Sequence, residues 1–292
     1  MWFTSDFEDY ELLDTSDGER LERWKDIILI RPDPQVLWKN AKKHPLWNKA
    51  NARYIRSSKG GGAWKVFSVP EDLLNLGWKI TRKNMTFCVR PTGFKHTGVF
   101  PEQAVNWDFI QDKISHAGRA VSVLNLFAYT GGATLAAAAA GASVCHVDAS
   151  KGIVAWAKEN AALSGLQNAP IRYIVDDCKK FIEREIRRGH KYDAIIMDPP
   201  SYGRGPGGEV WKLEDGVDEL VRLSSELLSD NPLFMIVNSY TAGLSASTMG
   251  YLLELHVRSK YKGLVDSDEI GLRVSATGAV LPSGSSARWE NS

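Results

Sequence analysis

The sequence predicts an α/β protein with a doubly wound, mostly parallel sheet of about seven strands, preceded by a small β-rich N-terminal region. Three observations support this prediction. From about Val121 onward, short buried segments alternate with segments of helical periodicity, which is typical of a parallel sheet with helices on both faces. Two extended segments near the end have no helix between them and predict an antiparallel hairpin. The first hundred residues hold short apolar runs broken by turn residues.

We place the boundary between the two regions so that residues 1–95 form the β-rich region and residues 96–292 form the larger domain. In the first region, runs of β-branched and aromatic residues predict strands, and clustered glycines predict a loop. The expected strands are Ile27–Arg31, Trp64–Val66 and Thr86–Val89, and the expected loop is Lys59–Gly62.

In the second region, apolar runs predict strands, and apolar residues three or four positions apart predict helices. The expected strands are Val121–Phe127, Ser143–Val147, Ile171–Val175, Ala194–Met197 and Leu233–Val237. The expected helices are the alanine-rich run 133–142, Ile153–Leu163, Lys179–Arg188, Leu213–Leu228 and Ala246–Lys260. The closing hairpin is expected at Gly263–Val274 and Gly278–Trp289.

Composition limits the classes of protein and partner. The 36 Lys and Arg against 35 Asp and Glu leave a formal net charge of +1, so the chain lacks the strongly basic character of many nucleic-acid-binding domains. Cys88, Cys145 and Cys178 are too few and scattered for a disulfide framework or a cysteine-rich zinc site. The first residues lack the basic flank and apolar core of a signal peptide, and no apolar run is long enough to span a bilayer. We therefore expect a cytoplasmic protein without a metal or membrane partner.

The first candidate site follows the first strand of the second region. Its two adjacent glycines let the backbone turn tightly and approach a ligand closely, and ligands of open α/β sheets bind outside the carboxyl ends of the strands. The glycine spacing is not that of a dinucleotide site, and no phosphate-loop lysine follows. A plain glycine turn is the alternative. The segment comprises Asn125, Leu126, Phe127, Ala128, Tyr129, Thr130, Gly131 and Gly132.

Acidic residues end the next two strands. Asp148, followed by Ala149 and Ser150, can accept hydrogen bonds from both hydroxyls of a ribose. Alternatively it caps the following helix, although Ser150 in that role would free Asp148 for a ligand. At Asp176–Cys178, after the third strand, a carboxylate or backbone group can bond an adenine amino group, and a helix cap is again the alternative.

The fourth strand ends in Asp198, Pro199, Pro200, Ser201 and Tyr202. Two prolines fix φ and remove backbone donors, so they make a rigid turn with outward carbonyls. Asp198 is then placed to accept from a nucleobase edge, and Tyr202 could stack on a base. A purely structural turn is the alternative, but consecutive prolines directly after a core strand are uncommon.

The order and spacing of these four sites resemble the Rossmann-like fold of class I S-adenosylmethionine-dependent methyltransferases. From about His96 to Trp289, roughly two-thirds of the chain, the sequence is similar to the bacterial 23S ribosomal RNA base methyltransferase family, whose branches act at cytosine C5 and guanine N7. Besides the segments at residues 125–132 and 198–202, the matching pieces are Thr97–Gln103 and Leu281–Gly284.

The resemblance implies roles for individual residues. The segment from Phe127 to Gly132 would hold the methionine part of S-adenosylmethionine, and Asp148 with its two followers would hold the ribose. Bordering the adenine would be Asp177 and Cys178. The residues from Asp198 to Tyr202 would face the substrate. Glu102 and Gln103 would close over the cofactor from the N-terminal side.

Two departures narrow the chemistry. Cytosine-C5 enzymes need a cysteine nucleophile near the end of the fourth or fifth strand, and here these strands end in Asp198–Ser201 and Val237–Thr241, which contain no cysteine. Enzymes that methylate exocyclic amines usually place an aromatic residue directly after the prolines, whereas Ser201 intervenes here. We therefore predict direct transfer to a ring nitrogen of a ribosomal RNA base, such as guanine N7. A small-molecule or protein methyltransferase, or a non-catalytic assembly factor that binds the cofactor, remains an alternative.

The most basic stretch of the chain lies in the tryptophan-rich N-terminal region. Aromatic residues interleaved with cations can stack on single-stranded bases, so this stretch could face RNA. The alternative is a solvated surface with the tryptophans packed in a small core. The cations are Lys39, Lys42, Lys43, Lys49, Arg53, Arg56 and Lys59, and the nearby tryptophans include Trp24, Trp38, Trp47, Trp64 and Trp78.

Overall fold

The computed structural model describes residues 1–4, 6–57, 61–69, 71–204 and 210–292. The chain forms two compact units. The sheet-and-helix unit comprises Met1–Trp2, Asn106–Ile270 and Gly284–Ser292, and the β-rich unit comprises Phe3–Val105 and Gly271–Ser283. Of the predicted loop at Lys59–Gly62, Lys59 and Gly60 lie outside the described residues, and Gly62 is the first residue of β5. The division into domains at residue 95 stays a prediction.

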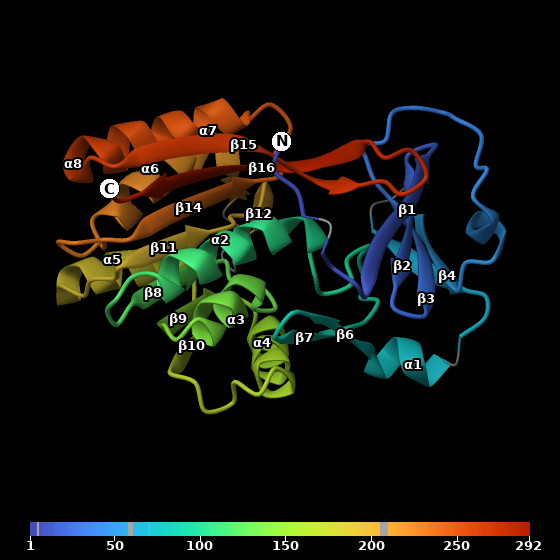
Figure 1. The fold of residues 1–292 in the computed structure, drawn as a ribbon, viewed down its shortest axis with the longest axis horizontal. Coiled ribbons are helices and arrows are strands. Elements are labelled where there is room, and N and C mark those ends of the chain that lie inside the picture. Colours follow the sequence, from blue (N-terminus) through green and yellow to red (C-terminus); the bar gives the residue numbers. More distant parts are fainter. Residues whose placement is uncertain (5, 58–60, 70, 205–209) are drawn as a thin grey trace. The chain divides into compact units, whose positions relative to one another are not determined.

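Seven strands form the sheet of the sheet-and-helix unit, in the order β10-β9-β8-β11-β14-β16-β15 (Figure 1). Neighbours from β10 to β14 run parallel, and β16 pairs antiparallel with β14. The predicted mostly parallel sheet with a closing hairpin is therefore confirmed. The strands are β8 (Ser122–Leu126), β9 (Ser143–Asp148), β10 (Ile171–Val175), β11 (Ala194–Met197), β14 (Phe234–Ser239), β15 (Leu264–Arg273) and β16 (Val280–Glu290).

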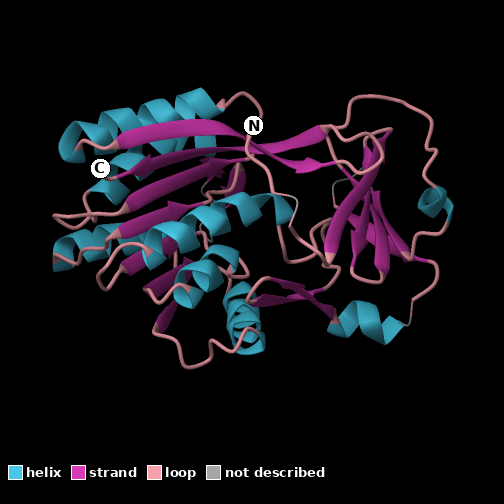
Figure 2. Cartoon of the chain, viewed as in Figure 1, coloured by secondary structure: helices cyan, strands magenta, loops and turns pink. Residues whose placement is uncertain are grey.

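Helices cover both faces of this sheet (Figure 2). They are α2 (Ala104–Ser115), α3 (Gly132–Ala139), α4 (Lys151–Leu163), α5 (Cys178–Arg188), α6 (Leu213–Ser225), α7 (Ala246–Leu253) and α8 (Ser259–Tyr261). The sequence predicted one helix over Ala246–Lys260, which is wrong in one respect. A π-helical turn, Glu254–Arg258 (η3), separates α7 from α8. Such turns have no signature in the hydrophobic pattern because they add one residue to a single turn.

The central strands are buried on both faces, and this explains why they could be recognised. Every residue of β11 and β14 is buried, as expected for inner strands of a parallel sheet. On one face, side chains such as Leu126, Met197 and Val237 form the main core with α5, α6 and α7. The other face carries α2 and α3, and Phe109 of α2 contacts Phe234 of β14 with ring centroids 5.5 Å apart.

The β-rich unit contains a five-stranded sheet in the order β1-β2-β3-β4-β5 and a separate two-stranded hairpin, β6-β7. The strands are β1 (Tyr10–Ser16), β2 (Glu19–Trp24), β3 (Ile27–Pro32), β4 (Ala52–Arg56), β5 (Gly62–Val66), β6 (Trp78–Arg82) and β7 (Met85–Val89). Short helical turns lie at Pro45–Asn48 (η1), Glu71–Leu76 (α1) and Pro101–Gln103 (η2). The predicted β-rich character is confirmed.

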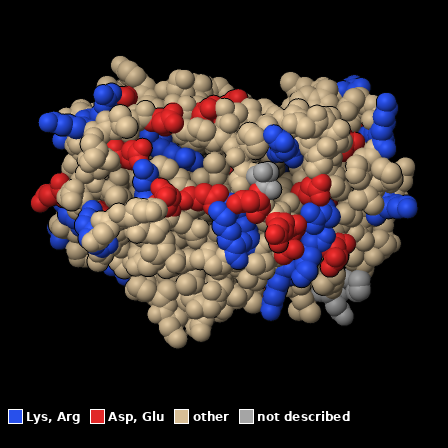
Figure 3. Space-filling view, in the orientation of Figure 1, with Lys and Arg blue, Asp and Glu red and all other residues tan. Residues whose placement is uncertain are grey.

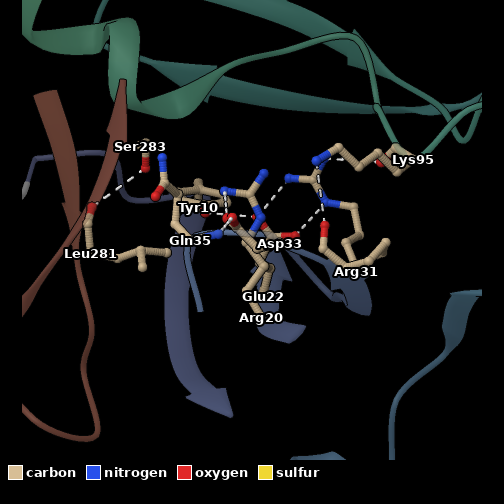
Figure 4. A network of polar contacts seen from close by, with 10 residues as sticks. Tyr10, Arg20, Glu22, Arg31, Asp33, Gln35, Lys95, Leu281 and Ser283 are labelled. Carbon is tan, nitrogen blue, oxygen red and sulfur yellow. Dashed lines mark hydrogen bonds and ion pairs between the residues drawn. The ribbon is translucent and has the colours of Figure 1, made fainter. Parts of the chain in front are cut away.

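Charged side chains are buried inside this unit (Figure 4). The Glu22 carboxylate accepts hydrogen bonds from the hydroxyl of Tyr10 at 2.8 Å and from Nη2 of Arg31 at 2.7 Å. Arg20 lies 3.4 Å from Glu22 and 3.6 Å from Asp33. The two guanidinium groups hold the pKa of Glu22 down at about 2 although burial opposes this.

The tryptophans of the basic stretch are mostly core residues. Trp24, Trp47 and Trp78 are buried, whereas Trp38 is 41% exposed. The packing alternative therefore holds for the first three. On the face drawn in Figure 3, Lys and Arg lie among Asp and Glu rather than in a patch of one sign.

Within the described residues, none of the helices is both long and apolar enough to cross a membrane.

Candidate functional site

The candidate site lies at the carboxyl edge of the seven-stranded sheet. The parallel register sets the ends of β8, β9, β11 and β14 level with one another. The residues at or just past these ends therefore share one edge, where ligands of such sheets bind. Phe127, Asp148 and Asp198 stand there, and Asn238, the last residue but one of β14, is level with them.

The loop after β8 has an unusual backbone. Phe127, Tyr129 and Gly131 have φ values of 54°, 49° and 92°, all in the left-handed region that non-glycine residues avoid. Gly131 is the N-cap of α3 and Gly132 its first residue, so the predicted turn from strand to helix is confirmed. Two left-handed non-glycine residues store about 1–3 kcal/mol each, and such strain persists only where the surroundings hold it.

Hydrogen bonds from three other elements hold this loop. Ala128 N–H donates to the carbonyl of Val147 in β9 at 3.0 Å. Phe127 N–H donates to Sγ of Cys178 at 3.2 Å. The buried Asn160 of α4 donates through Nδ2 to the carbonyl of Thr130 at 2.9 Å. The loop is therefore fixed before any ligand arrives, as a preorganised binding site requires.

Trp107 of α2 closes the space behind the start of α3. A Cβ atom at Gly132 would lie 2.6 Å from Cζ2 of Trp107, closer than real contacts allow. The second glycine of the loop is thus needed for this indole ring, which is buried. The sequence analysis did not single out Trp107, and no pattern in the sequence relates it to a glycine twenty-five positions later.

Asp148 presents a carboxylate at the end of β9. Oδ2 accepts from the backbone N–H of Tyr129 at 3.0 Å, and Oδ1 accepts from that of Ser150 at 2.9 Å. Two of roughly four lone-pair positions are therefore used, and the others remain for ligand hydroxyls. The cap of α4 is Ser150, whose hydroxyl accepts from Ile153 N–H; Ala149 and Ser150 are exposed beside the half-buried aspartate.

The acidic pair after β10 has structural partners. Asp177 caps α5 by accepting from Lys180 N–H at 2.9 Å, and Asp176 forms an ion pair with Arg184. Cys178 is buried between Phe127 N–H and the Val147 carbonyl, and this burial raises the pKa of its thiol well above the usual range. The helix-cap alternative is thus observed for Asp177, and its contact with adenine stays a prediction, as does that of Cys178.

The turn after β11 is held by a tryptophan that the sequence analysis also missed. The indole Nε1–H of Trp211 donates to the carbonyl of Pro200 at 2.7 Å, and Ser201 accepts from Leu213 N–H at 3.1 Å. Strands β12 (Tyr202–Arg204) and β13 (Val210–Lys212) pair directly after the turn. A Cβ at Gly216 would lie 2.4 Å from the Trp211 ring, so this glycine admits the indole.

The predicted substrate-facing residues are therefore brought to the same edge as the loop and Asp148. Tyr202 is 52% exposed, as a stacking residue must be before its partner binds. Asp198 and Pro199 follow β11 directly, between the ends of β8 and β14. The catalytic roles of Asp198, Pro199, Pro200, Ser201 and Tyr202 stay predictions.

Glu102 and Gln103 lie in the β-rich unit, within η2, and both are buried. One carboxylate oxygen of Glu102 is buried without a hydrogen-bond partner among the described residues, and burial raises the pKa of this carboxyl group. Their predicted role in covering the cofactor stays a prediction.

The donor set at the sheet edge fits S-adenosylmethionine. A half-buried carboxylate with unused lone pairs suits the two ribose hydroxyls, and the strained loop with its glycine pair gives the close backbone approach that the methionine part requires. The described residues hold no group of three or more His, Cys, Asp or Glu side chains placed to bind a metal ion.

Comparisons with known proteins point the same way. A family model described as S-adenosylmethionine-dependent methyltransferase matches residues 58–258. The crystal structure of a SAM-dependent methyltransferase from Agrobacterium tumefaciens is 39% identical, with a TM-score of 0.91 over 99% of this chain and 92% of that one. A methyltransferase structure complexed with S-adenosylhomocysteine shares the fold, at 20% identity and a TM-score of 0.70 over 98% of this chain and 76% of that one.

Among curated proteins, the chain is similar to the ribosomal RNA large subunit methyltransferases K/L. The protein from Shewanella frigidimarina is 36% identical over 155 residues, which are 52% of this chain and 21% of that protein. The protein from Shewanella baltica (strain OS155) is 37% identical over 139 residues, 47% of this chain and 18% of that protein. The chain thus matches about a fifth of the length of these relatives.

Proposed function

The chain belongs to the S-adenosylmethionine-dependent methyltransferase family, and we propose that it methylates a ring nitrogen of a base in ribosomal RNA. The family makes the chain an enzyme that uses S-adenosylmethionine. The substrate is the part that we propose. It is supported by the names of the curated relatives and by the turn at Asp198–Tyr202, whose carboxylate and exposed aromatic ring suit a base.

The position of the cysteines carries the proposal of direct transfer. Methylation at cytosine C5 needs a thiolate that attacks the ring. Cys88, Cys145 and Cys178 are all buried. Cys145 lies inside β9, and the sulfur of Cys178 accepts a hydrogen bond from the loop after β8. Neither cysteine is therefore placed to attack a base beside Asp198. A ring nitrogen with a free lone pair needs no such covalent step.

When bound, S-adenosylmethionine supplies a methyl group made electrophilic by the positive sulfur. The protein's part is then mainly to position the reactants, which can lower a barrier by about 7–11 kcal/mol. Asp148 and the loop at 127–132 would fix the cofactor, and the turn held by Trp211 would fix the base in line with the methyl group. Tyr202 would stack on the base. A ribosomal RNA substrate would place the activity in the cytoplasm.

Two measurements test this function. Calorimetric titration of S-adenosylhomocysteine should give binding by wild type that is lost in Asp148→Ala. Incubation with tritiated S-adenosylmethionine and ribosomal RNA should then give label that ribonuclease releases and protease does not. Protease-sensitive label, or label in small molecules only, would identify one of the alternative substrates. Cofactor binding without transfer to any substrate would favour the assembly factor.

A further inference from the structure

A chain of hydrogen bonds in the sheet-and-helix unit ends at Asn238, beside the proposed substrate turn. It starts at Arg288 of β16, whose guanidinium lies 4.0 Å from the ring centroid of Trp2 and 4.6 Å from that of Phe109. Stacking on two rings holds the orientation of this side chain. Its Nε–H then donates to Oδ1 of Asn106 at 2.9 Å.

Arg288 fixes which way the Asn106 amide points. An arginine can only donate, so the atom that it contacts must be the amide oxygen. The Nδ2 group of Asn106 must therefore point the other way, where it lies 3.0 Å from the Asn238 side chain and 3.2 Å from Oγ of Ser286. Oxygen and nitrogen of an amide are otherwise hard to tell apart, but here the donor-only arginine decides.

The same logic fixes Asn238. The atom of Asn238 that receives the Asn106 N–H must be its oxygen, so its own Nδ2 group faces away from Asn106. Nδ2 donates to no acceptor among the described residues. Among the described residues, the polar atoms that are both fully buried and without a partner do not include this Nδ2. Since Nδ2 has no acceptor among these residues, it must keep some exposed surface. This side chain is 98% buried, so the little surface that it keeps includes a free N–H₂ group of fixed direction.

Asn238 lies beside the turn that is predicted to face the substrate. It comes one position after Val237, which pairs with Met197, so Asn238 stands level with Asp198 across the two strands. Met197 and Val237 both point into the core with α5–α7, and side chains alternate along a strand. Asn238 therefore faces the side of the sheet that carries α2.

We propose that Asn238 is a specificity-determining residue whose amide N–H donates a hydrogen bond to an oxygen beside the methylated nitrogen of a guanine. This inference rests on the proposed function. Guanine presents N7 and O6 on one edge, both of them acceptors, whereas adenine presents N7 beside the N6 amino group, a donor. A fixed N–H₂ group binds the first and meets the second donor against donor. Guanine is thus accepted and adenine rejected with N7 free to receive the methyl group.

The test substitution is Asn238→Asp, which keeps the oxygen that accepts from Asn106 and removes the free donor. Asn168→Asp, at an exposed position, makes the same charge change elsewhere and serves as the matched control. A fixed contact of this kind discriminates between bases by roughly 10- to 100-fold. We expect transfer to ribosomal RNA to fall by that factor in the first variant only, with the affinity for S-adenosylhomocysteine within about twofold of wild type in both.

The identity of the labelled nucleoside is the direct readout. With tritiated S-adenosylmethionine and ribosomal RNA, digestion to nucleosides should place the label in guanosine. Label in adenosine, cytidine or uridine would overturn the inference and leave the proposed function standing. Unchanged transfer by Asn238→Asp would also overturn it.

A second measurement does not depend on the RNA. In protein labelled with ¹⁵N-asparagine and saturated with S-adenosylhomocysteine, the side-chain signal of Asn238 is identified by its loss in Asn238→Asp. Millimolar guanosine 5′-monophosphate should shift this signal, and adenosine 5′-monophosphate should not. A shift with guanosine monophosphate but no transfer to ribosomal RNA would overturn the proposed substrate alone. If neither nucleotide shifts the signal, or if both shift it equally, Asn238 does not have the proposed role.

Discussion

Replacing Gly132 by alanine should destabilise the sheet-and-helix unit, because the new methyl group has no space. The added Cβ would lie 2.6, 2.8 and 3.0 Å from Cζ2, Cε2 and Nε1 of Trp107. The indole is 4% exposed and cannot turn into solvent. The backbone itself would accept alanine, since Gly132 is helical and does not have a positive φ. The steric contact is therefore the only reason for a loss.

The magnitude follows from two opposing effects. An extra methyl group in a packed core costs about 1–3 kcal/mol, and alanine in a helix is favoured over glycine by about 1 kcal/mol. We expect a net loss of about 1–2 kcal/mol. For a unit of this size, each kcal/mol lowers the melting temperature by roughly 2–4 °C. Because α3 begins at this residue, affinity for S-adenosylhomocysteine should fall as well.

Differential scanning calorimetry measures the effect, with the transition of this unit identified as the one that S-adenosylhomocysteine raises. Gly152→Ala is the control, since that exposed helical glycine has no atom within 4 Å of an added Cβ; it should be neutral or stabilising. The double variant Gly132→Ala with Trp107→Leu should lose at least about 1 kcal/mol less free energy of unfolding than the sum of the losses in the two single variants. If Gly132→Ala melts at or above wild type, the packing argument is refuted.

Four further predictions follow from other parts of the structure. Asp148→Asn should weaken S-adenosylhomocysteine binding more than tenfold by calorimetry, because one amide cannot accept from two backbone N–H groups and also serve the ribose; affinity near that of wild type would contradict this. Trp211→Phe removes one hydrogen bond of about 1 kcal/mol, so it should slow methyl transfer roughly fivefold while leaving calorimetric cofactor affinity unchanged, and an equal loss of both would mean that Trp211 acts only on folding. Burial lowers the pKa of His146 to about 4, below its unfolded value, so its contribution to the free energy of unfolding is complete above about pH 6.5 and is lost as the pH falls towards 4. In urea unfolding at pH 7 and pH 4.5, the free energy of unfolding of His146→Gln should therefore fall between the two pH values by up to about 3 kcal/mol less than that of wild type. Identical pH profiles would exclude the effect. Because burial raises the pKa of Cys178 and Cys145, and Cys88 is buried too, Ellman's reagent should react only after unfolding, and fast reaction with native protein would contradict the packing.

The sheet-and-helix unit was largely predictable because its central strands are apolar on both faces. Ala194–Met197 matches the central strand β11 residue for residue, and Ile171–Val175 matches the edge strand β10, which could be recognised from its β-branched and aromatic residues. The loop, Asp148 and the proline turn could be located because they stand directly at strand ends, and the choice of Ser150 as helix cap could be weighed from its position alone.

Other features depend on contacts that local patterns do not contain. Strands β1 and β2 were not predicted because charged residues interrupt their apolar pattern. In β2, for example, Glu22 and Arg20 are buried, with charged partners that the fold brings near, such as Arg31 and Asp33. The same limit applies to Trp107 and Trp211, whose partners are a glycine and a carbonyl brought near by the fold. The orientation of Asn238 requires three residues from different elements and has no signature in the sequence.

The composition of the β-rich unit has a consequence for the newly made chain. One edge of β1 is completed by the tail, where Leu12 bridges to Val274 and accepts a backbone hydrogen bond from Ser275. During synthesis the N-terminal sheet, which is complete at Val66, emerges from the ribosome with this edge open and stays so until about 210 more residues, up to Val274, have been added. Exposed strand edges invite pairing with other chains. A product that ends before the β15–β16 hairpin would therefore lack part of both units and leave the edge of β1 unpaired. We expect such a fragment to aggregate rather than to keep partial activity.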